Sequence, residues 1–275
     1  MSAAGERVQL FLGEHERAGA DRALPNGEVC VRSVRSPEKA TFNEDAAAVI
    51  QLGEDSLVLA VADGVGGNPA GREASNAVVQ TLARVLTKLP DDQPQLRPAI
   101  LDAVEEANKT VLGLARGAAT TLVVAQLDAT RLRSYHVGDS ELLAVGQRGR
   151  IKQRVVPHSP TGFAVEAGLL DEDEAVQHDQ RHVLFNVIGS NDMRVEVGPA
   201  LELAVRDTVL LASDGLFDNL YIDEIVDTIC SGPLTAAADE LVERVRVRMS
   251  GAGKGDQPCK PDDLTVVLFR PHKPR

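Results

Sequence analysis

The segment LVLAVADGVGG, residues 57–67, decides the fold class of this chain. Residues 57–62 are a continuous apolar run with Gly-Glu shortly before it and Asp-Gly after it, and this pattern predicts a buried strand. Asp63 stands where that strand ends, and a glycine-rich turn leads from it into a helical pattern. The segment therefore predicts a strand inside a packed sheet whose end presents a carboxylate.

Helical and strand patterns surround this segment in an order that is typical of one α+β domain. Apolar residues recur at helical spacing in 71–89 and 95–115, and the break at 91–94 predicts a pair of helices on one face of a sheet. The acidic stretch 171–174 predicts a surface helix or flap within residues 160–182. Further strands are expected at 120–127, 131–137, 141–145, 201–212 and 264–270, and further helices at 222–230 and 234–249.

The domain organisation is expected to be simple, because no repeat and no interdomain linker interrupts these patterns. Residues 1–29 contain Gly, Pro and mixed charge with weak periodicity. They predict an N-terminal lead-in or an edge strand, and residues 30–275 are expected to form the single folded domain.

The composition narrows the class of function. The 275 residues are 43% hydrophobic and 25% charged, as in an ordinary globular protein. Acids exceed bases by 41 to 29 and Trp is absent, which argues against nucleic-acid binding. The chain has no run of eighteen apolar residues, and its start, MSAAGERVQL, lacks the features of a signal peptide. Three distant cysteines indicate free thiols in a reducing compartment, so we expect a cytoplasmic protein without nucleic-acid or membrane partners.

Five acidic positions stand at the start or end of strand-like runs. They are Asn43-Glu44-Asp45, Asp63, Asp139, Asp214 and Asp262-Asp263. One such acid is usually a turn former, but strand ends on one edge of a sheet can converge. Several carboxylates can meet only where cations neutralise them. Because the chain has no CxxC, HxH or HExxH pattern, an oxygen-ligand site for Mg²⁺ or Mn²⁺ is favoured over zinc, iron or copper.

Two glycine-rich segments fail as nucleotide-binding loops. After Gly64 and Gly66, the third glycine of a dinucleotide fingerprint is replaced by Pro69. In the 250–255 loop, Lys254 is followed by Gly255 where a P-loop needs Ser or Thr. At Gly64 the glycine instead allows the backbone carbonyl to approach a metal that Asp63 also binds.

The acidic positions belong to an ordered set of motifs. The motifs are Asn43-Glu44-Asp45, Asp63-Gly64-Val65-Gly66-Gly67, Gly117-Ala118-Ala119-Thr120-Thr121, Gly138-Asp139-Ser140, Ser213-Asp214-Gly215-Leu216-Phe217-Asp218 and Asp262-Asp263-Leu264-Thr265. In this order they resemble the type 2C metal-dependent protein phosphatases (PPM family) of bacterial type, and the resemblance spans about residues 30–270.

This resemblance implies a β-sandwich of two antiparallel sheets flanked by helices, with a two-metal centre at one end. Asp63 would bridge both metals, Gly64 would offer its carbonyl, and Asp214 and Asp262 would hold the metal on the other side. Glu44 and Asp45 match an element that supports metal-bound waters and a ligand. Asp139 and Asp218 match positions that hold a third, weaker metal in many members, and residues 158–182 match the flap beside the cleft.

The function that the resemblance implies is hydrolysis of phosphoserine and phosphothreonine in proteins by a hydroxide bridging two Mg²⁺ or Mn²⁺ ions. Asp63, Asp214 and Asp262 would be the catalytic residues. The implied partners are a phosphoprotein substrate and a serine/threonine kinase or its targets.

The sequence departs from the family pattern at three places. The family usually has an Arg that grips phosphate where this chain has Ala40, so we expect the neighbouring Lys39 to bind the phosphoryl group as a point charge. Val65 stands where some members have a His, which leaves the general acid unassigned. Glu141 replaces an Arg, and we expect it to form a surface ion pair.

Two alternatives stay open at this point. The missing Arg favours a pseudophosphatase, a binding module that recognises a phosphoprotein or kinase. The intact acidic set disfavours it, because carboxylates without neutralising metal are costly to keep. A metal hydrolase of small phosphate esters is the third possibility.

Overall fold

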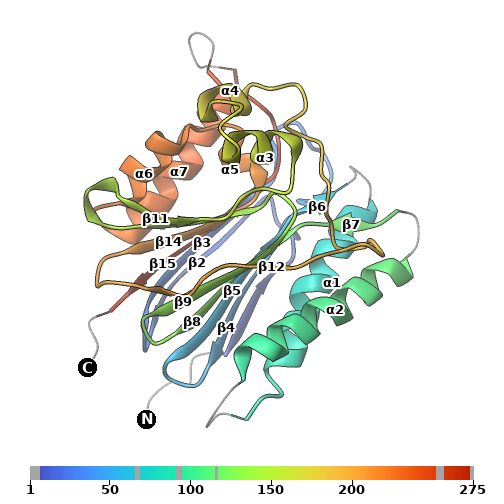
Figure 1. Ribbon diagram of the computed structural model, residues 1–275, viewed down its shortest axis with the longest axis vertical. Helices are drawn as coiled ribbons and strands as arrows, with labels where there is room; N and C mark the ends of the chain where they lie inside the picture. The colour runs from blue at the N-terminus through green and yellow to red at the C-terminus, as the bar shows by residue number, and fades with distance from the viewer. Residues whose placement is uncertain (1–6, 66–68, 91–94, 115–116, 252–256, 273–275) are drawn as a thin grey trace.

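Two antiparallel sheets face each other, and helices cover both outer faces (Figure 1). The computed structural model describes residues 7–65, 69–90, 95–114, 117–251 and 257–272. Within these residues, the first sheet runs in the order β1 (Val8–Phe11), β4 (Ala46–Leu52), β5 (Ser56–Ala62), β8 (Leu122–Asp128), β9 (Arg131–Val137) and β12 (Glu196–Val197), with β13 (Leu201–Glu202) also on β9. The second runs in the order β11 (Ile151–Arg154), β10 (Glu141–Val145), β14 (Thr208–Ala212), β15 (Leu264–Pro271), β3 (Gly27–Val34) and β2 (Arg17–Leu24).

The helices lie in two groups outside the sandwich, and two short ones stand at one end (Figure 1). A small ladder joins β6 (Gly64–Val65) to β7 (Ala119–Thr120). The helices are α1 (Pro69–Leu86), α2 (Leu96–Leu114), α3 (Pro160–Glu166), α4 (Glu172–Val176), α5 (Asp214–Phe217), α6 (Ile222–Ile229) and α7 (Leu234–Met249), with a 3₁₀ turn, η1 (Gln147–Gly149). The expected α+β sandwich is thereby confirmed.

The structure of strand β5 explains why residues 57–62 are all apolar. Every one of its seven residues is buried. Val58 and Ala60 face the core under α1 and α2, whereas Leu57 and Leu59 face the core between the two sheets. Because successive side chains of a strand point to opposite faces, a strand covered on both sides needs apolar residues at every position. Burying each large side chain contributes about 1.5–3 kcal/mol.

The other expected elements are found with small shifts at their ends. The helical pair is confirmed as α1 and α2, which pack on each other and share one core against the first sheet. The strands expected at 131–137, 141–145 and 264–270 are β9, β10 and β15, and the late helices are α6 and α7. The break expected at 91–94 lies outside the described residues.

The prediction of a single strand at 201–212 is wrong. The chain forms β13 in the first sheet and β14 in the second, joined by a turn in which Arg206 has φ of 78°. Asp207 fixes this turn, since its carboxylate accepts a 2.7 Å hydrogen bond from the Ala204 amide. Apolar residues stand on both sides of the turn because Leu203 of one part and Val209 and Leu211 of the other face the same core.

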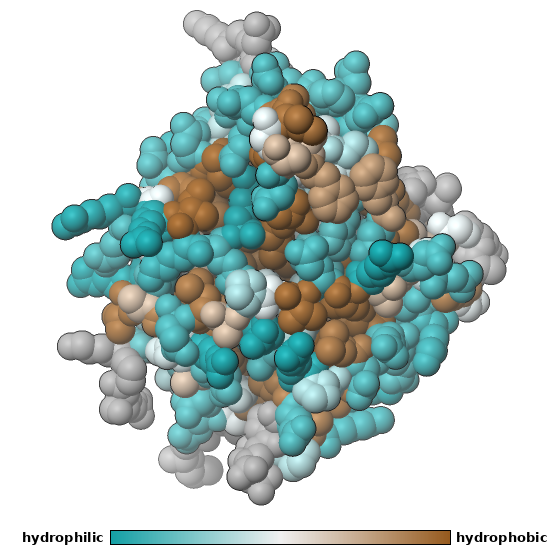
Figure 2. All heavy atoms as spheres, viewed as in Figure 1, coloured by the Kyte–Doolittle hydropathy of each residue, from teal (hydrophilic) through white to brown (hydrophobic). Residues whose placement is uncertain are grey.

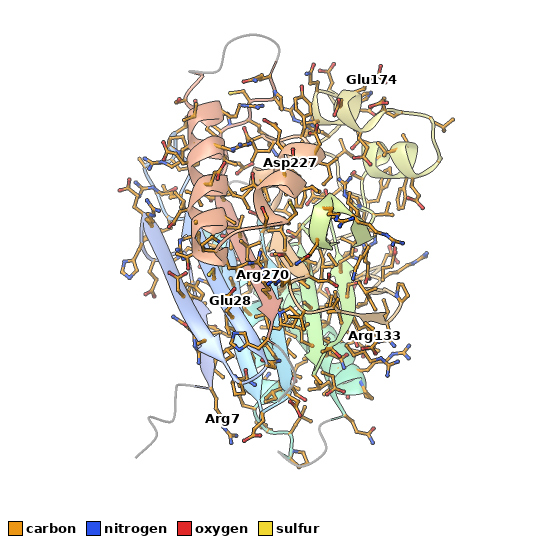
Figure 3. The ribbon with its side chains drawn as sticks, turned by 90° about the vertical axis from the view of Figure 1, so that its left-hand side faces the viewer. Arg7, Glu28, Arg133, Glu174, Asp227 and Arg270 are labelled. Carbon is orange, nitrogen blue, oxygen red and sulfur yellow. The ribbon has the colours of Figure 1, made fainter. Side chains whose placement is uncertain are left out.

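The N-terminal residues contribute to both sheets. β1 and β2 each lie at a sheet edge, and β3, which continues across residue 30, lies between β2 and β15 in the second sheet. Side by side on β3 and β15, Glu28 and Arg270 form an ion pair of 4.0 Å (Figure 3). Glu174 of the α3–α4 segment lies at the end of the molecule opposite Arg7 (Figure 3).

Among the described residues, no helix is both long enough and apolar enough to cross a membrane.

Candidate metal centre

The predicted acids meet at one end of the sandwich, on the ends of strands from both sheets. Asp63 follows β5 and Asp139 follows β9, both in the first sheet. Asp214 begins α5 directly after β14, and Asp262 stands just before β15, both in the second sheet. The charges of Asp45, Asp214, Asp262 and Asp139 each raise the pKa of Asp63, so these carboxylates lie near it. The expectation that the strand ends converge agrees with this arrangement.

Hydroxyl groups fix the backbone that carries Asp63. The carbonyl of Asp63 accepts hydrogen bonds from the Thr121 amide at 2.8 Å and from Thr120 Oγ1 at 2.7 Å. The Asp63 amide donates to Thr121 Oγ1 at 3.0 Å, and Thr121 Oγ1 lies 2.6 Å from Ser140 Oγ. The threonine pair and Ser140 therefore tie the Asp63 turn to the Asp139 turn.

Two glycines let three backbone segments meet beside Asp63. A Cβ on Gly64 would lie 2.5 Å from the Gly71 carbonyl oxygen and 2.9 Å from the Glu44 carbonyl oxygen. A Cβ on Gly71 would lie 3.0 Å from both Glu44 Oε1 and the Gly64 carbonyl oxygen. The Gly64 carbonyl and the Glu44 carboxylate thus face the same place. Side chains at either glycine would push them apart.

Asp45 holds the turn before α5 through a hydrogen bond with Ser213. Asp45 is fully buried, and its Oδ2 accepts a 2.8 Å hydrogen bond from Ser213 Oγ. Ser213 Oγ in turn accepts from the Thr265 amide at 3.0 Å. A Cβ on Gly215 would lie 2.0 Å from the Asp263 carbonyl oxygen, so this position also requires glycine.

Burial and mutual repulsion raise the pKa values of several of these carboxylates. Burial raises the pKa of Asp63 and of Asp139 well above the ordinary value, and neighbouring carboxylates raise both further. The pKa of Asp262 is also raised by burial and by Asp214, and burial with the Asp214 charge raises the pKa of Asp218 to about 7. Such a group of acids protonates unless cations join it.

The donor set fits hard divalent cations. The cluster offers carboxylate oxygens and one backbone carbonyl, the ligands that Mg²⁺ and Mn²⁺ take. Asp214 Oδ1 is buried and has no hydrogen-bond partner among the described residues. A buried carboxylate oxygen that faces other carboxylates without a donor is suited to a metal ion.

Lys39 lies between Glu44 and Asp263. Its Nζ donates to Glu44 Oε2 at 2.6 Å and to Asp263 Oδ2 at 2.7 Å. Asp263 is buried and also accepts the amides of Ser36 and Glu44, each at 2.8 Å. Burial would lower the pKa of Lys39, but these two carboxylates raise it well above its usual range, so Lys39 is a cation.

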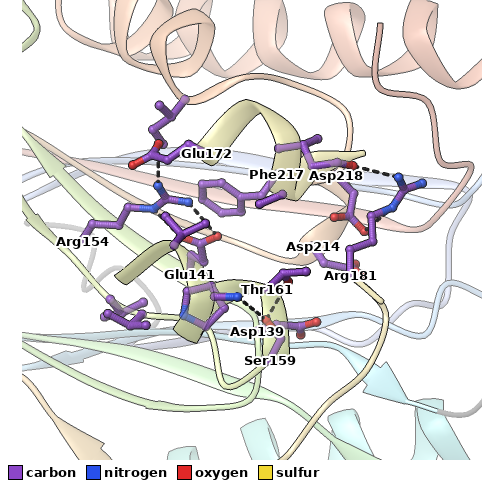
Figure 4. Close-up of a pocket in the computed structure, with 18 of the residues that line it drawn as sticks. Asp139, Glu141, Arg154, Ser159, Thr161, Glu172, Arg181, Asp214, Phe217 and Asp218 are labelled. Carbon is purple, nitrogen blue, oxygen red and sulfur yellow. Dashed lines mark hydrogen bonds and ion pairs between the residues drawn. The ribbon is translucent and has the colours of Figure 1, made fainter. Parts of the chain in front are cut away.

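Two cations at the site were missed by the sequence analysis. Lys260 Nζ donates to Asp214 Oδ2 at 2.5 Å and to Asp218 Oδ2 at 2.7 Å. Arg181, on the segment after α4, points to Asp218, with Nε 3.9 Å from Oδ2 (Figure 4). The sequence signal for Lys260 is its place two residues before Asp262; Arg181 stands far from every motif.

The departure at Glu141 has a different outcome from the one expected. Glu141 does form an ion pair, with its Oε2 2.7 Å from Arg154 Nε, but the Glu141 side chain is buried. Arg154 also reaches Glu172 of α4 at 3.1 Å and lies over the Phe217 ring (Figure 4). The pair therefore joins β10 and β11 to the flap. The expected surface ion pair is in fact partly buried and has a structural role.

Two histidines hold the turn that carries Asp139. His136 is buried and its ring stacks on His158 with centroids 4.3 Å apart, so it is packed in the strand as its position suggests. Burial lowers the pKa of His136 to about 4, which keeps its ring neutral. His158 accepts the Gly138 amide on Nδ1 at 3.1 Å, and its own amide donates to the Gly138 carbonyl at 2.9 Å.

A cavity of about 300 Å³ opens between the acidic cluster and the flap (Figure 4). Asp139, Asp214 and Asp218 line its inner side, and Glu172 and Asp173 of α4 line its outer side. Phe163 of α3 and Phe185 have exposed rings that stack on each other with centroids 6.0 Å apart. Hydrophobic atoms gather on this face around α3 and α4 (Figure 2). The helices α3 and α4 form the surface flap that the sequence predicts.

Comparisons with known proteins agree with this geometry. A family model described as "Protein phosphatase 2C" matches residues 36–247. PhpP, a protein phosphatase of Streptococcus pneumoniae, is 31% identical over 243 residues, which cover 84% of this chain and 92% of PhpP. PstP, a serine/threonine protein phosphatase of Mycobacterium tuberculosis, is 29% identical over 231 residues, which cover 78% of this chain but 41% of PstP. The chain therefore spans about two fifths of the length of PstP.

The fold likeness extends over most of the chain. The catalytic domain of PstP, crystallised in complex with two manganese ions, superposes with a TM-score of 0.71. That match has 24% sequence identity and covers 90% of this chain and 99% of the other.

Proposed function

The chain belongs to the protein phosphatase 2C family, and from this premise we propose that it hydrolyses phosphoserine and phosphothreonine in proteins with the help of Mg²⁺ or Mn²⁺. The observation that carries the proposal is the meeting of acids from both sheets near Asp63, whose pKa is raised by burial and by the neighbouring carboxylates. These acids can hold divalent cations, and phosphoryl transfer needs the positive charge that such cations bring to the site.

The residues present fit a two-ion core. Asp63 is close enough to Asp214 and Asp262 for their charges to raise its pKa, and Gly64 is its neighbour in the chain, so Asp63 can be shared by both ions. Glu44 faces the same place from below α1, while Asp45 supports the Asp214 turn through Ser213. When bound, the ions supply a water activated near neutral pH and neutralise charge on the phosphoryl oxygens. Asp139 and Asp218 border the core on its cavity side.

The proposed partners are phosphoproteins and the serine/threonine kinases that modify them. The cavity beside the cluster is bordered by the flap, so a phosphorylated side chain can reach the acids from outside. Cys30, Cys230 and Cys259 are free thiols, which supports a reducing compartment such as the cytoplasm.

Phosphopeptide turnover with added Mn²⁺, and again with excess chelator, tests the proposed function. We expect turnover with metal and none with chelator. A chain that binds phosphopeptide without turnover would be the pseudophosphatase that the missing Arg at Ala40 suggests. A higher kcat/KM on nucleotides than on phosphopeptides would instead make it a hydrolase of small phosphate esters.

We further propose that Lys39 contacts the phosphoryl group. Two of the three ammonium hydrogens are used by Glu44 and Asp263, and one is left for a substrate oxygen. Arg35 and Arg72, two further candidates for this role, are engaged elsewhere, because Arg35 donates to the Thr41 carbonyl and Arg72 stacks on Phe42.

Lys39→Ala is expected to raise KM several-fold with a smaller fall in kcat, because ground-state binding of phosphate is lost. It also leaves Asp263 buried without its cation, which should cost roughly 1–3 kcal/mol of the free energy of unfolding, a discounted share of a broken buried pair. Steady-state kinetics and denaturant titration measure the two effects. The double variant Lys39→Ala/Asp263→Asn removes the orphaned charge. If KM returns to the wild-type value together with stability, Lys39 is an ion-pair partner and not a phosphate ligand.

The acidic stretch of the flap is expected to tune the choice of substrate. Glu172 and Asp173 line the cavity, whereas Asp171 caps α4 and Glu174 accepts the Asp171 amide. Glu172→Gln/Asp173→Asn should lower the preference for basic over acidic phosphopeptides by about two- to fivefold, the size of one or two exposed ion pairs.

Asp171→Asn/Glu174→Gln is the matched control for the flap prediction. It removes the same charge, but from side chains that bond to the helix terminus and do not line the cavity. Ratios of kcat/KM for a basic and an acidic phosphopeptide give the answer. An equal change in both double variants would mean that the flap acts by overall charge and not by contact.

A further inference from the structure

A lysine ammonium is built into the cavity side of the acidic cluster. Lys260 Nζ lies 2.5 Å from Asp214 Oδ2, 2.7 Å from Asp218 Oδ2 and 3.2 Å from Asp262 Oδ2. Each of the three ammonium hydrogens can therefore be directed at a carboxylate. The two shortest contacts go to Asp214 and Asp218, so the ammonium sits chiefly between these two acids.

The fold holds Lys260 in this place through its backbone. The fully buried Asn219 side chain accepts the Lys260 amide on Oδ1 at 2.9 Å and donates from Nδ2 to the Lys260 carbonyl, also at 2.9 Å. The same Nδ2 donates to the Gly215 carbonyl of α5 at 2.9 Å. Arg248 of α7 donates to the Asn219 carbonyl at 3.2 Å. One buried amide thus binds the lysine to the turn that carries Asp214 and Asp218.

The charge of Lys260 is distributed unevenly over the cluster. Burial would lower its pKa, but Asp214, Asp218 and Asp262 raise it well above the usual range, so the ammonium stays charged. Lys260 lowers the pKa of Asp139 and is the main reason why the pKa of Asp214 lies below its ordinary value despite burial. Asp214, Asp218 and Asp262 are the three acids that Lys260 Nζ reaches, so this lysine brings a fixed positive charge to the cavity side of the cluster.

We propose that the Lys260 ammonium is the resident cation of the place between Asp214 and Asp218, and that this chain consequently binds two divalent ions and no third. The inference rests on the proposed function, in which Asp63, Asp214 and Asp262 hold the two core ions. An ammonium hydrogen-bonded to Asp214 Oδ2 and Asp218 Oδ2 and a Mg²⁺ or Mn²⁺ at about 2.0–2.2 Å from the same oxygens would occupy overlapping volumes and repel each other. The charge at this place then does not depend on the concentration of free metal.

Calorimetric titration with Mn²⁺, together with direct counting of bound Mn²⁺ after gel filtration, tests the inference on the full chain. The wild type should bind two ions, and Lys260→Met should bind two and gain a third, weaker one. Lys260→Met/Asp218→Asn should return to two, because the vacated place then lacks its second acid. Lys152→Met is the matched control, since Lys152 pairs with Asp207 away from the cluster and should leave the count at two.

Turnover gives a second readout. At Mn²⁺ concentrations that fill only the core, Lys260→Met should be slower by roughly tenfold, the cost of removing a supporting partner of a metal site, and the rate should recover as Mn²⁺ is raised. Metal-free Lys260→Met should also unfold at a lower temperature, because three partly buried acids lose their cation.

A third ion bound by the wild type would overturn the inference without any variant and would leave the proposed function standing. A count of two in both the wild type and folded Lys260→Met would overturn it as well, because no place would have been vacated. Two ions without phosphopeptide turnover would contradict the proposed function but support the inference. A wild type that binds no Mn²⁺ would contradict both.

Discussion

Replacing Asp63 by Asn is expected to abolish tight Mn²⁺ binding and to lower kcat/KM by at least about 100-fold, the usual loss when one stabiliser of transition-state charge is removed. Asp63 is the acid around which Asp45, Asp139, Asp214 and Asp262 gather. A neutral amide in this place weakens both core ions at once. Calorimetry with Mn²⁺ and phosphopeptide kinetics measure the two losses.

The same substitution should stabilise the metal-free protein. Burial and the surrounding carboxylates raise the pKa of Asp63, so the native state holds this proton more tightly than the unfolded state. The contribution of the group to stability is present below its unfolded pKa, near 4, and is lost as the pH rises through the raised folded value. Asn stays neutral at every pH, so metal-free Asp63→Asn should melt above the metal-free wild type at pH 7 to 8.

The melting temperature of metal-free Asp63→Asn shows whether this variant has lost only a metal ligand or has a damaged fold. Asp207→Asn is the control, because Asp207 is also buried but pairs with Lys152 outside the cluster. It should lose stability and keep Mn²⁺ binding and turnover, the opposite of Asp63→Asn. Wild-type Mn²⁺ affinity and turnover in Asp63→Asn would show that this residue is not shared by the ions.

Most of the fold could be predicted because its signals are local. From Leu57 to Ala62, the residues buried on both faces of β5 are apolar without interruption, and α1 and α2 carry their apolar residues at helical spacing. The 201–212 segment was misjudged because both parts of it face the same inter-sheet core. Its division into β13 and β14 depends on the Asp207 bond to the Ala204 amide, which leaves no trace in the apolar pattern.

The acids of the site could be predicted because they stand at strand ends. The contacts of the basic side chains at the site could not be predicted. Lys39 and Lys260 reach the cluster on long side chains whose direction is set by contacts distant in sequence. Lys260 is aimed by Asn219, 41 residues away, and Arg181 by the position of the flap. Which positive charge meets which carboxylate is therefore a property of the packed molecule.

Asp139→Ala is expected to keep two tightly bound Mn²⁺ ions and to lower kcat by roughly 10- to 100-fold, the range typical for partners just outside a metal's ligands. Asp139 lines the cavity, and its pKa is raised by burial and then by Asp214 and Asp218. It therefore belongs to the cavity side of the cluster, away from the acids that hold the core. The Lys260 ammonium would remain on Asp214 and Asp218, so no place for a third ion should open in this variant.

The Asn variant separates the charge of Asp139 from its shape. The turn that carries this residue is held by Gly138, whose φ of 100° and contact with Thr121 leave no room for a Cβ, and by the His158 bond to its amide. These contacts involve the backbone, so neither Asp139→Ala nor Asp139→Asn should disturb the turn. Equal losses of kcat in both variants would show that the negative charge is what matters. Loss of all tight Mn²⁺ binding in either one would make Asp139 a core ligand and would move the two-ion site toward the cavity.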